Sequence, residues 1–167
     1  MARAIRSIVV MLSAALLTAC TTVELSKSEP AQGQAMTEAV LNQKIDALLS
    51  QQRQICMDPK YADLRGKSPC QTSEITFKQL TDNAKITSGQ RIQLIEASTQ
   101  MDRINKEITA LYAAFGTEQA TRVAQARQWA YEQSITSRLN LVNQKITWGQ
   151  YLDQRVKINT EMLRKAQ

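Results

Sequence analysis

The sequence predicts an all-α protein, a small helical bundle of four to five helices joined by antiparallel hairpins, with one loop clipped by a disulfide. Apolar residues recur at alternating spacings of three and four over several stretches, which is the period of a helix packed on one side. Turn-forming residues are scarce, with 5 Gly and 3 Pro in 167 residues. Aromatic residues make up only 5% of the chain, which further favours helices over a β-sandwich or barrel.

The first twenty residues, MARAIRSIVVMLSAALLTAC, have the pattern of an export leader. Arg3 and Arg6 give the leader a positive beginning. The apolar run from Ile8 to Leu17 is too short to span a bilayer comfortably, and small residues close it. A membrane anchor that stays attached to the chain is the alternative interpretation of this stretch.

The leader ends in Leu17-Thr18-Ala19-Cys20, which resembles the lipobox of bacterial lipoproteins: Leu, a small residue, Ala or Gly, then Cys. The resemblance implies that residues 1–19 are a signal peptide cleaved before Cys20. The Cys20 thiol would receive diacylglycerol, and its new amino group would be acylated. Two or three acyl chains anchor a protein firmly in membrane lipid. Thr follows Cys20 where an inner-membrane retention signal would have Asp, so the expected location is the outer membrane, facing the periplasm, with surface exposure left open.

The mature chain divides into a tether and a folded domain. Residues 20–36 lack a hydrophobic period and contain Ser, Pro, Gly and Gln. They are interpreted as an acylated flexible tether with a mean reach of about 20–24 Å. Residues 37–167 form the expected helical bundle domain.

Cys56 and Cys70 remain once Cys20 is acylated, an even number in a compartment where disulfides persist. The ring they would close contains about 15 residues, which corresponds to roughly 3 kcal/mol of stabilisation in the chain-entropy model. A metal site would need more ligands nearby, and a redox pair usually has a closer spacing. A structural disulfide is therefore the prediction.

Two nearly identical octets, NAKITSGQ at residues 83–90 and NQKITWGQ at residues 143–150, predict two corners between helices. Thr87 with Gln90, and Thr147 with Gln150, have the T-x-x-Q spacing of a capping box. In this box the Thr hydroxyl accepts from the third backbone N–H of the helix, and the Gln side chain accepts from the N–H of the Thr. Duplication of a helical hairpin and convergence on favourable corner chemistry both stay open as the origin of the repeat.

The corners divide the chain into expected helices. A helix is expected from Thr37 to about Cys56, followed by the clipped loop and a short helix at about 73–83. A long helix follows at about 88–115, and Gly116-Thr117 predicts a tight hairpin into a helix at about 118–142. The last helix is expected at about 148–165. The residues expected to face the core are Leu41, Ile45, Leu48, Leu49, Ile55, Cys56, Ile75, Leu80, Ala84, Leu94, Ala97, Met101, Ile104, Ile108, Leu111, Phe115, Ala120, Ala124, Tyr131, Ile135, Leu139, Val142, Trp148, Leu152, Val156 and Leu163.

Charge and composition limit the classes of function. Residues 117–167 carry eight basic and four acidic side chains, which form either a solvated helix face or a surface that attracts anionic lipids or acidic envelope proteins. Nucleic acid is not an expected partner outside the cytoplasm. The chain has no histidine, which excludes Ser-His-Asp and Cys-His catalysis. No catalytic residue, metal, cofactor or small-molecule substrate is predicted, and the protein is not expected to be an enzyme.

The candidate partner-binding residues are Trp148, Tyr151, Trp129 and Arg155, because Trp, Tyr and Arg are the side chains that most often anchor protein interfaces. The alternative is that these aromatic residues cover the end of the bundle. The expected function is that of a protein-binding or envelope-assembly accessory with an unidentified envelope protein as its partner. A surface-exposed inhibitor or exclusion lipoprotein, and a structural envelope lipoprotein without a dedicated partner, are the two alternatives.

Overall fold

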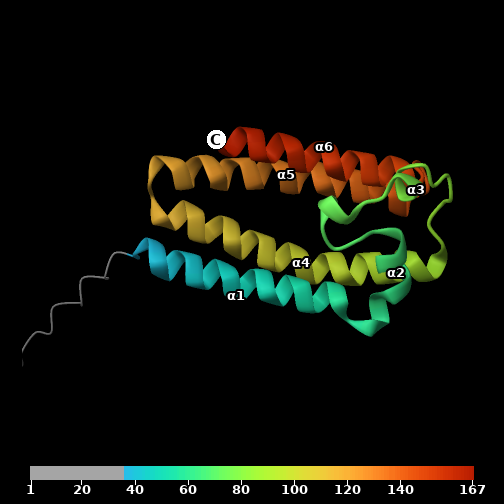
Figure 1. Ribbon diagram of the computed structural model, residues 1–167, viewed down its shortest axis with the longest axis horizontal. Coiled ribbons are helices and arrows are strands. Elements are labelled where there is room, and N and C mark those ends of the chain that lie inside the picture. Colours follow the sequence, from blue (N-terminus) through green and yellow to red (C-terminus); the bar gives the residue numbers. More distant parts are fainter. Residues whose placement is uncertain (1–35) are drawn as a thin grey trace, which may run out of the picture. The chain divides into compact units, whose positions relative to one another are not determined.

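The structure, a computed structural model, describes residues 36–167, so the predicted signal peptide, Cys20 and the tether up to residue 35 lie outside the described residues. The described part of the chain contains six α-helices, and Pro59–Tyr61 and Thr72–Glu74 form 3₁₀ turns. The helices are α1 (Glu38–Met57), α2 (Ala62–Lys67), α3 (Phe77–Leu80), α4 (Ser88–Phe115), α5 (Glu118–Val142) and α6 (Trp148–Ala166). The predicted all-α fold is confirmed (Figure 1).

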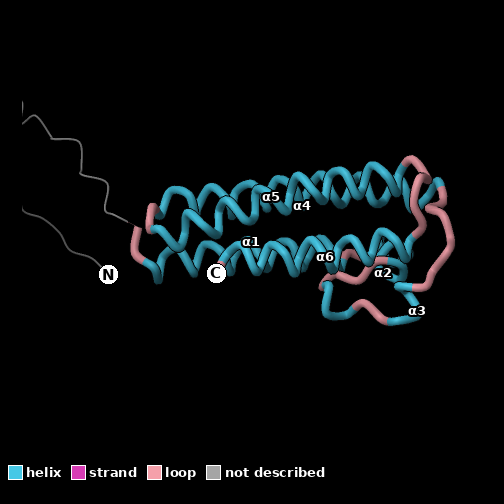
Figure 2. Tube along the Cα trace, turned by 90° about the horizontal axis from the view of Figure 1, so that it is seen from above, coloured by secondary structure: helices cyan, strands magenta, loops and turns pink. Residues whose placement is uncertain are grey.

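The four long helices pack in the order α1, α4, α5, α6, each antiparallel to the next (Figure 1). Figure 2 shows α4 and α5 in one layer and α1 and α6 in the other. The short helices lie on the α1–α6 side at one end, where α2 contacts α4 and α3 contacts α6. We call this end the looped pole (residues 58–87 and 143–147) and the opposite end, where α1 begins and α6 ends, the terminal pole. None of the helices within residues 36–167 combines the length and hydropathy needed to cross a bilayer.

Threonine begins most of these helices. In each case the Thr side-chain oxygen accepts a hydrogen bond from the backbone N–H three residues later, one of the donors that a helix start leaves unpaired. The capping residues are Thr37, Thr76, Thr87, Thr117 and Thr147. At the other end of α4, Gly116 has a φ of 76°, the left-handed conformation that glycine adopts without a steric penalty. The predicted Gly-Thr hairpin is therefore confirmed.

The short helix expected at about 73–83 is smaller than predicted. Thr72–Glu74 is a 3₁₀ turn, and α3 covers only Phe77–Leu80. Ile75 and Thr76 are extended between them, because Thr76 caps a new helix start instead of continuing the turn before it. The clipped loop contains α2, a helix that was not predicted.

The core has two parts. The looped-pole cluster joins the loops to α4, α5 and α6, and its buried residues are Tyr61, Leu64, Ile86, Leu94, Ala97, Leu141, Trp148, Tyr151 and Leu152. The α1–α4 cluster lies nearer the terminal pole and consists of Leu41, Ile45, Leu48, Ile104 and Ile108. The predicted seam of α4 thus supplies both clusters, with Leu94 and Ala97 in one and Ile104 and Ile108 in the other.

Some of the expected core residues are exposed instead. Leu49, Leu80, Ala84, Leu139 and Leu163 face solvent. In α5 the buried residues are Ala120, Ala124, Ala126, Ala130, Ser137 and Leu141. This helix packs against α4 and α6 on two adjacent sides, so its buried surface is wider than one stripe and turns away from Leu139. Small side chains such as Ala126 and Ala130 let a neighbouring helix approach closely.

Candidate functional site

The two repeated octets pack against each other at the looped pole. The backbone N–H of Trp148 donates to Ala84 O over 3.0 Å, and the indole Nε1–H of Trp148 donates to Gln90 Oε1 over 3.2 Å. The side-chain amide of Gln144 donates to Ile86 O over 3.2 Å. Each octet therefore begins a helix and also binds the other octet, which the sequence alone did not predict.

Both predicted capping boxes are confirmed. Gln90 N donates to Thr87 Oγ1 over 3.3 Å, and Thr87 N donates to Gln90 Oε1 over 3.1 Å. The corresponding distances between Thr147 and Gln150 are 3.3 and 2.9 Å. Gln90 Oε1 thus accepts two hydrogen bonds, one within its own box and one from the Trp148 indole.

Gly149 of the second octet packs closely against the residues just before the first octet. Its N–H donates to Asp82 O over 2.8 Å, which satisfies another donor at the start of α6. A Cβ at this position would lie 2.3 Å from Leu80 O and 3.0 Å from Asp82 O, so no larger residue fits without backbone movement. Gly89, the equivalent residue of the first octet, has open space around it.

Trp148 and Tyr151 do not form a partner-binding surface. Trp148 is 0% exposed and Tyr151 is also buried, with the two rings edge to face at 5.9 Å between centroids. Both belong to the looped-pole cluster, because the first turn of α6 is covered by residues 80–86 of the other corner. The proposed interface role of these two residues is therefore wrong, and the alternative interpretation, that they cover the end of the bundle, describes their position.

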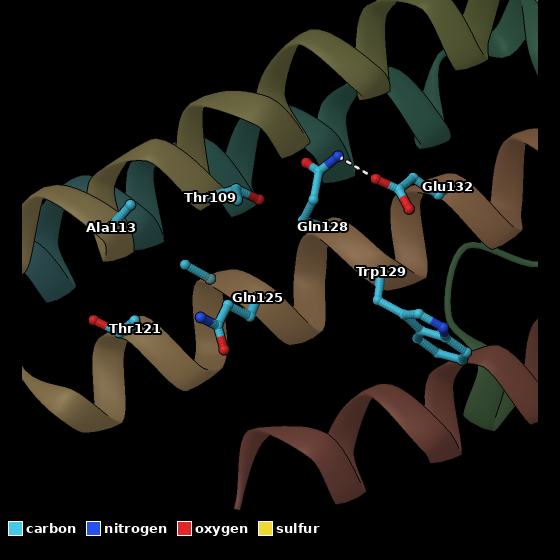
Figure 3. Close-up of a pocket in the computed structure, with 8 residues that line it drawn as sticks. Thr109, Ala113, Thr121, Gln125, Gln128, Trp129 and Glu132 are labelled. Atoms are coloured by element: carbon cyan, nitrogen blue, oxygen red, sulfur yellow. Dashed lines mark hydrogen bonds between the residues drawn. The ribbon is translucent and has the colours of Figure 1, made fainter.

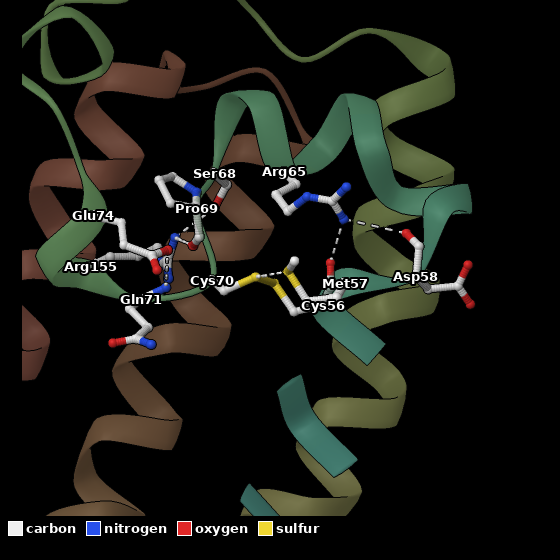
Figure 4. The surroundings of a disulfide bond; sticks show 10 residues. All are labelled: Cys56, Met57, Asp58, Arg65, Ser68, Pro69, Cys70, Gln71, Glu74 and Arg155. Atoms are coloured by element: carbon white, nitrogen blue, oxygen red, sulfur yellow. Dashed lines mark hydrogen bonds between the residues drawn. A yellow bond between two sulfur atoms is a disulfide. The ribbon is translucent and has the colours of Figure 1, made fainter. Parts of the chain in front are cut away.

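Arg155 holds the clipped loop against α6. Its Nη1 donates to Ser68 Oγ over 2.6 Å and to Pro69 O over 3.1 Å (Figure 4). The guanidinium is half-buried and engaged in these bonds, so it positions the loop within the fold. The sequence signal for this role was weak, since nothing local connects Arg155 to residues more than eighty positions earlier.

The predicted disulfide is present. Cys56 at the end of α1 and Cys70 after α2 are bonded, with 5.9 Å between their Cα atoms. Figure 4 shows Arg65 beside the bridge, where its Nη1 donates to Cys56 O over 2.9 Å. The bridge ties the segment after α1 to the loop that Arg155 fixes on α6, so it connects the two outer helices of the bundle.

Asp82 links three parts of the looped pole. Its carboxylate accepts from Lys67 Nζ over 2.7 Å and from Ala84 N over 2.8 Å, while its carbonyl accepts from Gly149 N. The Lys67 hydrogen bond, and then the Ala84 bond, hold the pKa of Asp82 below its ordinary value. A second ion pair, Lys60 with Glu96 at 2.7 Å, joins the loop to α4 and lowers the pKa of Glu96.

The exposed apolar surface of the looped pole comes from other residues. Phe77, the first residue of α3, is 80% exposed, and Met57 is also exposed. A large aromatic side chain exposed to solvent is typical of residues that anchor protein interfaces. Phe77 is exposed in this way, whereas Trp148 and Tyr151 are buried in this fold. Phe77 is not recognisable from the sequence, because its neighbours have no clear hydrophobic period.

Trp129 lies at the opposite half of the molecule from Trp148. It is half-buried, with Lys165 Nζ 5.2 Å from its ring centroid, and it lines a shallow hollow between α4 and α5 (Figure 3). Thr109 and Ala113 come from α4, and Thr121, Ala124, Gln125, Gln128 and Glu132 from α5. The four candidate residues are therefore not brought together: two are buried, one holds a loop, and one lies beside this hollow.

A third capping box went unrecognised in the sequence. Thr76 and Gln79 form the same reciprocal pair, with Gln79 N donating to Thr76 Oγ1 over 3.3 Å and Thr76 N donating to Gln79 Oε1 over 3.0 Å. Residues 75–79, 86–90 and 146–150 read ITFKQ, ITSGQ and ITWGQ, so I-T-x-x-Q begins three helices of the looped pole. A search for the five-residue pattern instead of the octet finds it.

Comparison with known proteins gives no match, since no family model fits the chain and neither a curated protein nor a solved structure is similar to it. Within residues 36–167, no group of three His, Cys, Asp or Glu side chains converges as metal ligands do. The features that bear on function are therefore the sequence of the leader, the disulfide and the surfaces of the bundle.

Proposed function

We propose that this protein is an outer-membrane lipoprotein that faces the periplasm and acts as a protein-binding or envelope-assembly accessory. The single observation that carries the proposal is Leu17-Thr18-Ala19-Cys20 behind a short apolar run, the pattern of the lipobox. The Cys56–Cys70 bridge supports an oxidising compartment, because disulfides persist there and are rare in the cytosol.

The position of the exposed surface supports a role in binding. The chain enters the bundle at the start of α1, at the terminal pole, while Phe77 lies at the looped pole. The 28 residues of α4 run between the two poles, a length of about 42 Å. A tether attached at one pole leaves the other open to a partner. The disulfide and Arg155 fix the loop that precedes α3. Gln79 of α3 donates to Gly66 O over 3.1 Å, which holds Phe77 close to the fixed loop and lowers the entropy lost when a partner binds.

The anchor is tested by Cys20→Ser. We expect the native chain to incorporate palmitate and to fractionate with the outer membrane, and the variant to do neither. A mature chain found in the cytosol with its leader uncut would overturn the proposal. Protease treatment of intact cells separates the two faces of the membrane, since digestion would instead indicate the surface-exposed inhibitor or exclusion lipoprotein.

The partner is tested with a photo-reactive phenylalanine analogue at position 77. The same analogue at Leu163, an exposed residue of α6 near the terminal pole, is the matched control. We expect one discrete envelope protein to be crosslinked from position 77 and not from position 163. Equal crosslinking of abundant envelope proteins from both positions would contradict a dedicated partner and favour the structural lipoprotein.

A further inference from the structure

The outer surface of the α4–α5 pair, which we call the α4–α5 face, has large apolar side chains at one end. Ile92 is 67% exposed, Ile95 is 50% exposed and Leu139 is 54% exposed. Ile95 and Leu139 are each about six helical turns from the Gly116-Thr117 hairpin, so antiparallel packing places them side by side. The Arg138–Asp102 ion pair, 2.8 Å between Nη2 and Oδ2, links the two helices next to them.

The other end of the same face is hollow. Ala113 of α4 and Thr121 and Ala124 of α5 are the small residues that line the depression of Figure 3. Ala113 lies 18 residues after Ile95, and Thr121 lies 18 residues before Leu139. Eighteen residues are five helical turns, so each apolar side chain and its small counterpart share one side of their helix, about 27 Å apart.

This arrangement is self-complementary. A two-fold axis in the plane of the face, perpendicular to the helices and midway along them, places α4 antiparallel on α4 and α5 antiparallel on α5 of a second copy. It places Ile95 over Ala113 and Leu139 over Thr121 of the second copy. The large side chains of each copy thus lie in the hollow of the other. A two-fold axis parallel to the helices would instead place α4 over α5 of the second copy, so Ile95 would meet Leu139 and the hollow would stay empty.

Two charges between the two ends fit the same axis. Lys106 and Glu132 are exposed, and helical spacing places each within about 20° of the side that carries Ile95 or Leu139. Within the described chain, neither forms an ion pair. Lys106 lies two residues beyond the midpoint between Ile95 and Ala113, and Glu132 two residues beyond the midpoint between Thr121 and Leu139, so the axis brings Lys106 of each copy to the height of Glu132 of the other.

The area is that of a stable dimer. From Ile92 to Gly116 the face is about 37 Å long, and two helices are about 20 Å wide. The product is on the order of 700 Å² for each copy, close to the roughly 800 Å² per partner of a standard interface. We propose that the α4–α5 face binds a second copy of this chain in antiparallel orientation.

The homodimer is compatible with the proposed anchor and does not depend on it. The antiparallel arrangement leaves each looped pole free at an end of the dimer. The expected tether of residues 20–36 extends to about 56–61 Å at most, so both copies can be attached to one membrane with the dimer lying along it.

The first test measures the mass of the full chain in detergent micelles by sedimentation equilibrium, over roughly 1–100 μM protein. We expect dimers, and we expect Ile95→Lys and Leu139→Lys each to weaken dimerisation about tenfold or more, as substitution of an interface anchor does. Leu163→Lys, an equally exposed leucine outside the face, should leave the dimer unchanged. A chain that is monomeric throughout, or a dimer that resists both substitutions, would overturn the proposal.

The second test fixes the orientation with single cysteines and a short thiol crosslinker. Chains with Thr121→Cys mixed with chains with Leu139→Cys should crosslink in the antiparallel dimer, and Thr121→Cys alone should not. Self-crosslinking of Thr121→Cys without the mixed product would refute the antiparallel arrangement. All of these residues are exposed, so circular dichroism of each variant should match that of the native chain.

Discussion

The packing of the second octet against the residues just before the first leads to a specific prediction for Gly149. Replacing it with Ala adds one methyl group that would lie 2.3 Å from Leu80 O, 2.9 Å from Leu80 C and 3.0 Å from Asp82 O. All three neighbours are backbone atoms, so no side chain can rotate away to make room. The same backbone receives the N–H groups of Trp148 and Gly149.

The magnitude follows from the distances. A carbon and a carbonyl oxygen in contact normally lie about 3.3–3.6 Å apart, so the corner of residues 80–82 must move by about 1 Å. Overpacking of this kind costs about 1–3 kcal/mol. Weakening one of the hydrogen bonds that the N–H groups of Trp148 and Gly149 donate costs about 1–3 kcal/mol more. Ala is favoured over Gly within a helix, which offsets at most about 1 kcal/mol of this loss. We expect Gly149→Ala to lower the free energy of unfolding by about 2–4 kcal/mol.

Gly89 supplies the matched control. It is also the second residue of its helix and follows the same Ile-Thr-x sequence, but no atom lies within 4 Å of the Cβ that would be added there. Gly89→Ala should leave stability unchanged or raise it by up to about 1 kcal/mol. Urea unfolding followed by circular dichroism and tryptophan fluorescence measures both. If the two variants differ by less than about 1 kcal/mol, the octets do not pack as described.

The other predictions concern single interactions at the looped pole. In urea unfolding, Thr147→Ala should lower stability by about 0.5–2 kcal/mol, whereas Thr147→Ser should not. If the native chain and both variants are equally stable, Thr147 does not stabilise the start of α6 as a cap. Reduction of the disulfide should lower the free energy of unfolding by about 3 kcal/mol. A Cys56→Ala/Cys70→Ala double variant should be less stable than the oxidised protein, and a reductant should not change its stability. The pKa of Asp82 is lowered in the folded chain, so its ionised form contributes stability above an ordinary aspartate pKa of about 3.9, and this contribution disappears as the pH falls through the lower folded value. Stability measured from pH 6 downward should therefore decline less steeply in Asp82→Asn than in the native chain, and parallel curves would contradict the Lys67 pairing.

Local chemistry in the sequence predicted much of the fold. Helix starts depend on a few adjacent residues, so Thr87 with Gln90 and Thr147 with Gln150 were recognisable from spacing alone. The Cys56–Cys70 pairing needed only an even count.

The burial of Trp148 was not predictable in the same way. It depends on residues 82–86, sixty positions earlier, closing over the start of α6. The pattern within one helix shows which side is apolar, but it does not show how many neighbours cover that side. Leu139 was misplaced for this reason, since α5 turns a wide face, made mostly of small residues, toward two helices and leaves Leu139 outside it.

The division of the core between early and late segments has a consequence for synthesis. A nascent chain that has reached Phe115 already contains every buried member of the α1–α4 cluster. The looped-pole cluster has to wait, because Trp148, Tyr151 and Leu152 are among the last residues to leave the ribosome. Until they arrive, Ile86 and Leu141 lack part of their cover, and the unfinished half of the protein is open to proteases and to association with other incomplete chains.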